Sequence, residues 1–173
     1  MIQDDTLPLK KTAHSLVFGN GIPNSRLLFI GEGPGFHEDE QGIPFVGNAG
    51  QLLNKLLASI NLERKDIFIT NVVHHRPPNN RDPSPSELLA YGKYLDKMID
   101  IINPKVIVTL GRFSMGKFLP DKKISSIHGS QFELKWHNLD LIVVPMFHPA
   151  AALRNPNIMT EIKEDFLKLK KYI

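Results

Sequence analysis

The chain has 173 residues, which is enough for one domain with a sizeable core, and we expect a single domain over residues 1–173. Its hydrophobic content of 42% and charged content of 23% are typical of a globular protein. The absence of cysteine excludes disulfides, thiolate catalysis and cysteine-ligated metal centres. With no long apolar run and no signal-peptide pattern, a cytoplasmic protein with no membrane contact is expected. A net charge of +3 suits an anionic partner but does not identify one.

Hydrophobic periodicity predicts the following elements in chain order. After a polar, aperiodic start, strands are predicted from short apolar or β-branched runs at 16–19 (a short strand or an entry to the sheet), 25–30, 66–73 and 105–110. A hairpin is predicted at 131–136 and 139–146. Helices are predicted from apolar residues three or four positions apart at 48–60, 86–102 and 157–172, with a short helix at 111–119.

The alternation of strands and helices predicts an α/β fold, a three-layer α/β/α sandwich with a central, mainly parallel four-stranded sheet. In such sheets, ligands bind outside the carboxyl ends of the strands. Distinctive residues follow each predicted strand there: Gly31–Gly35, Asn71 with the loop at 74–85, Gly111 with Arg112, and Phe147–Ala150. The residues alone therefore predict a functional site at this edge of the sheet.

The stretch 31–50 is a glycine-rich turn that leads from a strand into a helix. Gly31, Gly33 and Gly35 allow positive φ or a close approach of the backbone to a ligand, and Pro34 stiffens the turn. A phosphate-binding loop would carry lysine and a hydroxyl residue, which are missing here. The turn is better suited to a neutral group or to a developing positive charge, and Phe45 offers a flat face to a planar group.

Four motifs occur in a distinctive order: Gly-Glu-Gly-Pro-Gly at 31–35, Gly-Ile-Pro-Phe-Val-Gly at 42–47, Thr-Asn-Val-Val at 70–73 with Arg-Pro-Pro-Asn-Asn-Arg at 76–81, and His-Pro-Ala-Ala-Ala-Leu-Arg-Asn-Pro at 148–156. Together they resemble the family 4 uracil-DNA glycosylases over nearly the whole chain. Each motif alone is weak, whereas the ordered set is specific.

The resemblance implies roles for particular residues. The implied catalytic residues are Glu32, Glu38 and His148; the implied uracil-binding residues are Gly33, Phe45, Asn71 and His148; the implied DNA-binding residues are Arg76, Arg81, Leu153 and Arg154. Phe45 would stack on a flipped uracil, Asn71 would read its polar edge, and His148 would donate to its O2 oxygen. Glu32 would position the base or the attacking water, with Glu38 as a second carboxylate near the water. Such groups suit a bond cleavage that leaves positive charge on the sugar and negative charge on the base.

The chain departs from that family at one feature. Family 4 members resemble each other in four cysteines that bind a [4Fe-4S] cluster, and the corresponding positions here are Asp4, Leu7, His75 and Tyr91. We therefore expect no iron–sulfur cluster, no metal site and no other cofactor. Packing and hydrogen bonds must then hold this region, and we expect Asp4 to pair with His75 or Tyr91.

Four of the implied site residues also have a purely structural interpretation. Glu32 could accept backbone amides at a helix start, Phe45 could be a core aromatic, Asn71 a turn former and His148 a structural histidine. The glycosylase interpretation fails only if all four structural interpretations hold together.

Three functional hypotheses follow. The first is a monofunctional uracil-DNA glycosylase that uses water, because the edge motifs carry no lysine for a Schiff base. The second is a glycosylase for another deaminated base, hypoxanthine or xanthine. The third is a non-catalytic module that binds nucleic acid on the same fold. The loop at 74–83 lacks the basic insertion through which one branch of the superfamily crosslinks to DNA, and we reject that activity. Expected partners are uracil-containing DNA and a sliding clamp or another repair protein, and we expect a monomer.

Overall fold

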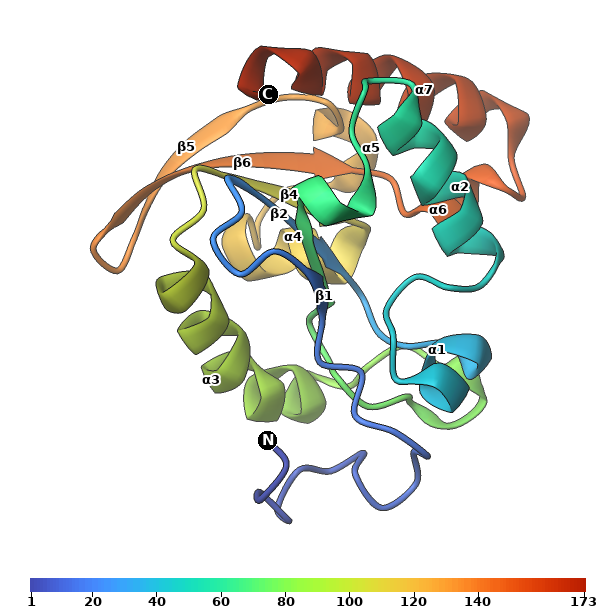
Figure 1. The fold of residues 1–173 in the computed structure, drawn as a ribbon, viewed down its shortest axis with the longest axis vertical. Helices are drawn as coiled ribbons and strands as arrows, with labels where there is room; N and C mark the ends of the chain where they lie inside the picture. The colour runs from blue at the N-terminus through green and yellow to red at the C-terminus, as the bar shows by residue number, and fades with distance from the viewer.

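A computed structural model describes residues 1–173 and centres on one six-stranded sheet with the strand order β1-β3-β2-β4-β6-β5 (Figure 1). The strands are β1 (Asn20–Gly21), β2 (Leu27–Gly31), β3 (Phe68–Asn71), β4 (Val106–Leu110), β5 (Phe132–Trp136) and β6 (Leu139–Met146). The four inner strands β3, β2, β4 and β6 run parallel, while β1 and β5 are antiparallel at the two edges.

The predicted α/β class and parallel arrangement are confirmed, but the predicted number of four strands is wrong. The prediction of a hairpin is correct, yet its first arm, β5, was not counted as a member of the sheet. The other additional strand, β1, has two residues and therefore carries no alternating pattern that a sequence could display.

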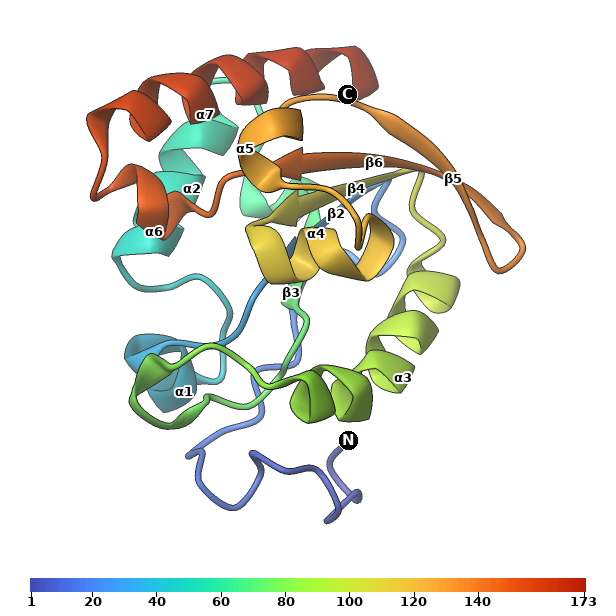
Figure 2. The same ribbon diagram turned by 180° about the vertical axis from the view of Figure 1, so that it is seen from behind.

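The helices cover both faces of the sheet. They are α1 (Phe36–Gln41), α2 (Asn48–Ala58), α3 (Pro85–Ile102), α4 (Arg112–Phe118), α5 (Ile124–Ile127), α6 (Pro149–Ala152) and α7 (Pro156–Lys168), with 3₁₀ turns at η1 (Arg64–Asp66), η2 (Pro78–Asn80) and η3 (Leu169–Tyr172). Helices α2 and α7 lie together on one side of the sheet, and α3 and α4 lie on the other (Figures 1 and 2). None of these helices combines the length and the apolar composition that crossing a membrane requires.

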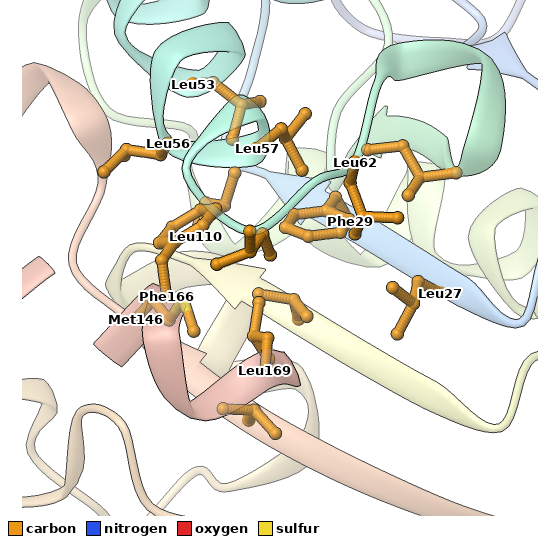
Figure 3. Close-up of a cluster of buried hydrophobic side chains, with 14 of the residues drawn as sticks. Leu27, Phe29, Leu53, Leu56, Leu57, Leu62, Leu110, Met146, Phe166 and Leu169 are labelled. Carbon is orange, nitrogen blue, oxygen red and sulfur yellow. The ribbon is translucent and has the colours of Figure 1, made fainter. Parts of the chain in front are cut away.

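Alternate residues of the inner strands enter two different cores, because successive side chains on a strand point to opposite faces. On β2, Leu27 and Phe29 join the larger core beneath α2 and α7, which Figure 3 shows in close-up. Leu28 and Ile30 join the second core beneath α3 and α4. All five residues of β2 are buried, as expected for a parallel strand covered on both sides. Full burial of each large apolar side chain stabilises the fold by about 1.5–3 kcal/mol.

The N-terminal segment packs against α3 through a small apolar group, called here the N-terminal cluster, of Leu7, Leu9, Val73 and Tyr91. Leu7 and Tyr91, two of the four positions where the resemblance implies iron–sulfur cysteines, thus belong to this apolar group. His75, the third position, is also buried, and its Nδ1 lies 2.7 Å from the Tyr91 hydroxyl.

The predicted pairing of Asp4 with His75 or Tyr91 is wrong. Asp4 instead accepts hydrogen bonds from Thr6, from Lys93 at 3.0 Å and from the Tyr94 hydroxyl. Tyr94 and Lys93 belong to α3 and reach the N-terminal segment from its surface, whereas His75 and Tyr91 are buried and satisfy each other. These contacts lower the pKa of the Asp4 carboxyl well below its usual value, mainly through the Thr6 and Tyr94 hydrogen bonds.

Candidate active site

A cavity of about 630 Å³ opens where the parallel strands end. Its lining includes eight of the ten residues to which the sequence assigned roles: Glu32, Gly33, Glu38, Phe45, Asn71, Arg81, His148 and Arg154. Segments that follow β2, β3, β4 and β6 all contribute to it, so the structure brings together the four segments predicted to meet at this edge. The other two residues, Arg76 and Leu153, do not line the cavity.

Phe45 occupies a conformation that few non-glycine residues adopt. Its φ of 55° lies in the left-handed region, which costs an L-residue roughly 1–2 kcal/mol. Arg64 holds this turn, because its guanidinium donates to the Phe45 carbonyl at 2.6 Å and also to the Pro44 carbonyl. Gly50 makes the conformation possible, since a Cβ there would overlap the Phe45 carbonyl.

Two further residues complete the surroundings of the Phe45 ring. A Cβ on Gly31 would lie 2.5 Å from the ring, so that position must be glycine for the ring to rest on the strand. The His148 ring lies stacked with it, with the ring centroids 5.6 Å apart at 26°. Phe45 therefore belongs to the main core cluster and also borders the cavity.

Glu38 holds the turn that presents Phe45. Its Oε1 accepts hydrogen bonds from the backbone N–H groups of Val46 at 2.9 Å and Gly47 at 2.8 Å. These N–H groups lie at the start of α2, where backbone donors have no intrahelical partner. One oxygen of the predicted second carboxylate is thus occupied by the backbone.

Asn71 ends β3 and is almost completely buried, at 2% exposure. Its Oδ1 has no hydrogen-bond partner in the protein. A buried polar atom left unpaired costs about 1–3 kcal/mol, so the fold keeps here a group that a bound ligand can satisfy.

His148 is held as a neutral imidazole. Burial, together with the charge of Arg154, lowers its pKa to about 4. The Ala150 N–H donates to its Nδ1 at 3.1 Å. A neutral ring that accepts at Nδ1 carries its proton on Nε2, which is therefore the donor.

Glu32 follows β2 and contacts the start of α4. Its Oε1 accepts from the Phe113 N–H at 3.1 Å, and burial raises its pKa even though this hydrogen bond and the charge of Arg112 oppose the shift. Gly111 must be glycine for two reasons: a Cβ there would overlap this carboxylate, and its φ of 104° is one that other residues rarely adopt.

The arginines around the cavity differ in their partners. Arg81 forms two hydrogen bonds with the Glu87 carboxylate, at 2.6 and 2.8 Å, and Arg112 pairs with Asp82. Neither Arg76 nor Arg154 forms an ion pair. Leu153 follows α6 and is half exposed beside a second groove between α2 and α7, next to Arg154 on the cavity.

Sequence reasoning missed Arg64 and assigned no role to Arg112. Arg64 acts on carbonyls about twenty positions earlier in the chain, and no periodicity or local motif marks such a contact. Arg112 lines the cavity, and its position directly after β4 was the signal in the sequence that could have identified it.

No group of three or more histidine, aspartate or glutamate side chains is placed to hold a metal ion. With no cysteine, the chain cannot ligate an iron–sulfur cluster through thiolates.

The strands of this α/β domain end at a cavity with an aromatic ring, a buried amide and a neutral histidine. This arrangement suits the binding of a flat, polar ligand.

Comparison with known families identifies the class of protein, since the model of the uracil DNA glycosylase superfamily matches residues 18–170. The type-4 uracil-DNA glycosylase of Sulfurisphaera tokodaii is 48% identical over 160 residues, covering 88% of this chain and 72% of that protein. Those of Archaeoglobus fulgidus and Thermotoga maritima are 43% and 42% identical, covering 93% and 96% of this chain and 83% and 87% of theirs. The chain belongs to the type-4 uracil-DNA glycosylase family.

Proposed function

We propose that the protein binds DNA that contains uracil, takes the uracil out of the base stack into the cavity, and hydrolyses its N-glycosidic bond to leave an abasic site. The observation that carries this proposal is the unpaired amide oxygen of the buried Asn71, which lies in the same cavity as the His148 imidazole. Membership of the type-4 uracil-DNA glycosylase family supports the choice of uracil.

Recognition of the base rests on Asn71 and Phe45. An amide offers an acceptor and a donor side by side, which matches the N3–H and O4 groups of uracil. The unpaired Oδ1 favours a ligand that brings an N–H, and cytosine carries no hydrogen on N3. The Phe45 ring borders the cavity from a turn fixed by Arg64 and Glu38, and it can hold the plane of the base.

His148 assists the departure of the base. When the bond between the sugar C1′ and uracil N1 breaks, its electron pair stays on the base, which leaves as an anion with charge on O2. The Nε2–H of a neutral imidazole can donate to that oxygen, and the interaction strengthens as charge develops. The low pKa keeps Nδ1 without a proton at physiological pH, so Nδ1 can accept from the Ala150 N–H while Nε2 carries the proton that faces the base.

Glu32 acts at the sugar. A carboxylate in the cavity stabilises positive charge on the sugar and can accept a hydrogen bond from the water whose oxygen attacks C1′. The cavity lining contains no lysine, which supports water as the nucleophile and a monofunctional enzyme. Leu153 would fill the space left by the flipped base, and Arg76 and Arg154 would contact phosphates.

The decisive experiment is a cleavage assay with an end-labelled oligonucleotide that has one central uracil, either single-stranded or opposite guanine or adenine. Wild type, His148→Ala and a control variant, His137→Asn, are compared with and without hot alkali. His137 is exposed on the turn before β6, at the end of the sheet opposite the cavity. We expect breakage only after alkali, at equal rates for wild type and control, and about 10²-fold slower for His148→Ala.

Other outcomes separate the alternatives. Breakage without alkali would indicate a lyase and contradict the monofunctional mechanism. No breakage of any uracil substrate would overturn the proposal, and oligonucleotides with hypoxanthine or xanthine would then distinguish a different glycosylase from a non-catalytic module.

A further inference from the structure

A large aromatic side chain stands in the open beside the cavity. Phe36, the first residue of α1, is 52% exposed although aromatic rings normally lie inside a fold. The preceding residue, Gly35, lines the cavity, so the ring lies immediately outside its mouth. Neither the core clusters nor the site described above uses this ring.

The ring is not simply loose on the surface. The Arg76 guanidinium lies over it, 5.2 Å from the ring centroid, and the His37 ring meets it edge-on at 5.5 Å. Arg76 is itself fixed, because its Nε donates to Asn80 Oδ1 at 2.7 Å. The contact between Phe36 and Arg76 therefore joins α1 to the loop after β3, two segments that lie side by side in both views of the fold (Figures 1 and 2).

The loop that carries Arg76 is held in a strained form. Asn79 and Asn80 are consecutive residues with φ of 55° and 53°, in the left-handed region that asparagine tolerates best after glycine. Asn80 lines the cavity while its side chain holds Arg76 beside Phe36. Strain of this kind is concentrated at functional sites, where the surrounding structure maintains it.

The charge around the ring indicates the class of ligand. Arg81 and Arg112 are neutralised by Glu87 and Asp82, whereas Arg76 has no carboxylate partner. An exposed aromatic ring with an unpaired guanidinium is the combination by which proteins bind unpaired nucleotides, since the ring stacks on the base and the cation attracts the phosphate. A protein partner would require an apolar surface wider than one ring, and the cavity beside Phe36 is lined by six charged side chains.

We infer that Phe36, backed by Arg76, is a stacking platform for an unpaired nucleobase next to the flipped uracil. The inference rests on the proposed function, because it takes the cavity as the place of the flipped base. It adds a contact to the neighbouring nucleotide, which single-stranded DNA offers without the cost of unpairing a duplex.

The test measures equilibrium binding by fluorescence anisotropy. The probe is a labelled single-stranded oligonucleotide whose one uracil nucleotide carries a 2′-fluorine, which disfavours positive charge on the sugar and so slows cleavage. A second and third probe replace the nucleotide on the 5′ or on the 3′ side of the uracil by an abasic analogue. The proteins are wild type, Phe36→Ala, Phe36→Trp and Leu89→Ala, the last of which removes an 81% exposed side chain on α3.

We expect Phe36→Ala to raise the Kd for the first probe roughly 5- to 100-fold, the range expected from loss of one base–aromatic stack. Phe36→Trp and Leu89→Ala should bind within about twofold of wild type. One of the two abasic probes should weaken wild type to a similar extent and cause no further loss in Phe36→Ala, because both changes remove the same contact.

Two results would overturn the inference: Phe36→Ala binding the first probe as well as wild type does, or both abasic probes weakening Phe36→Ala as much as they weaken wild type. Binding does not depend on bond cleavage. If wild type shows this coupling in binding but cleaves no uracil substrate, the proposed hydrolysis is contradicted while the inferred role of Phe36 is supported.

Discussion

The cavity and the N-terminal cluster treat buried polar groups in opposite ways. In the cavity, Asn71 keeps an unpaired Oδ1 and Phe45 sits in a left-handed conformation. In and beside the N-terminal cluster, the Tyr91 hydroxyl is satisfied by His75, and Leu7 and Leu9 pack around it. Unpaired polar atoms and backbone strain both cost stability, and such features are concentrated at functional sites. Unpaired buried polar atoms also occur away from the cavity, at His74, Thr109 and Trp136. The site is therefore marked by an unpaired atom and backbone strain that lie together on one cavity.

The N-terminal cluster includes two of the positions at which the resemblance to family 4 implies cysteines. Of the four positions where the resemblance implies cysteines, Leu7 and Tyr91 belong to the N-terminal cluster and His75 bonds to Tyr91. The fourth, Asp4, is partly buried and bonds to Lys93 and Tyr94. Burial lowers the pKa of His75 and raises that of Tyr91, so each remains neutral and can share a hydrogen bond in an apolar setting. Packing and hydrogen bonds thus connect the N-terminal segment, the loop after β3 and α3.

The largest expected effect concerns two histidines, His74, which is fully buried near the N-terminal cluster, and His148, which is partly buried in the cavity. His74 adjoins the N-terminal cluster, and burial lowers its pKa to about 3; in the cavity, His148 has a pKa of about 4. The hydroxyl of Thr70 donates to the Phe18 carbonyl, so its oxygen accepts from His74 Nε2, which therefore carries the proton of the His74 ring.

Both histidines therefore make the fold sensitive to acid. Their contribution to stability is complete above pH 6.5 and is lost as the pH falls toward 3, because only the unfolded chain binds the protons in that range. For His74 the loss is on the order of 5 kcal/mol. Urea unfolding at a series of pH values should show this slope, reduced more by His74→Gln than by His148→Gln. An unchanged slope in His74→Gln would contradict the assignment.

The next largest effect concerns Asn71, and it tests whether this residue of the cavity serves the ligand or the fold. Asn71→Ala should slow uracil release by about 10²-fold or more, because the amide that reads the base is lost. Its stability should change little, since the substitution also removes an unpaired buried oxygen. Cleavage kinetics and urea unfolding measured on the same preparation check both statements. A variant that loses activity only by unfolding would show that Asn71 is structural.

The opposite result is expected on the side of the N-terminal cluster. Tyr91→Phe leaves the buried His75 Nδ1 without a partner and should lower the free energy of unfolding by about 1–3 kcal/mol. Its rate of uracil cleavage, measured well below the unfolding temperature, should equal that of wild type. The double variant with His75→Leu should recover part of the stability, because both polar partners are then absent. A slower enzyme with unchanged stability would assign Tyr91 to the site.

These contrasts also show what the sequence could predict. Helices α2 and α3 were predicted within a few residues, because burial of one face imposes a repeat on the residues. Strand β2 was predicted from its continuous apolar run, which burial on both faces requires. Helices α1, α5 and α6 were missed, since six or four residues are too few to show a period. The gathering of residues at the carboxyl ends of the strands followed from topology alone.

Contacts between side chains and distant backbone groups were beyond prediction. The turn at Phe45 depends on Arg64 and Glu38, whose bonding partners are eight to twenty positions away and follow no repeat. For the same reason the sequence suggested a partner for Asp4 among the buried residues, whereas the geometry of α3 supplies Lys93 and Tyr94. The pairing of Arg81 with Glu87 was equally invisible until α3 was in place.

That pairing leads to the smallest expected effect, which separates two arginines that the sequence placed together as DNA-binding. Arg154 has no ion-pair partner, whereas Arg81 is held by two hydrogen bonds to Glu87. A free guanidinium can neutralise a phosphate and release its counterions, while a paired one must first give up its carboxylate. Arg154→Ala should therefore weaken uracil-DNA binding several-fold and reduce the slope of log Kd against log salt by about one. Arg81→Ala should change the Kd and the salt slope less, and anisotropy titrations at four salt concentrations measure the difference.

Equal losses in the two variants would mean that the ion pair between Arg81 and Glu87 opens when DNA binds. Glu87→Gln should then strengthen binding.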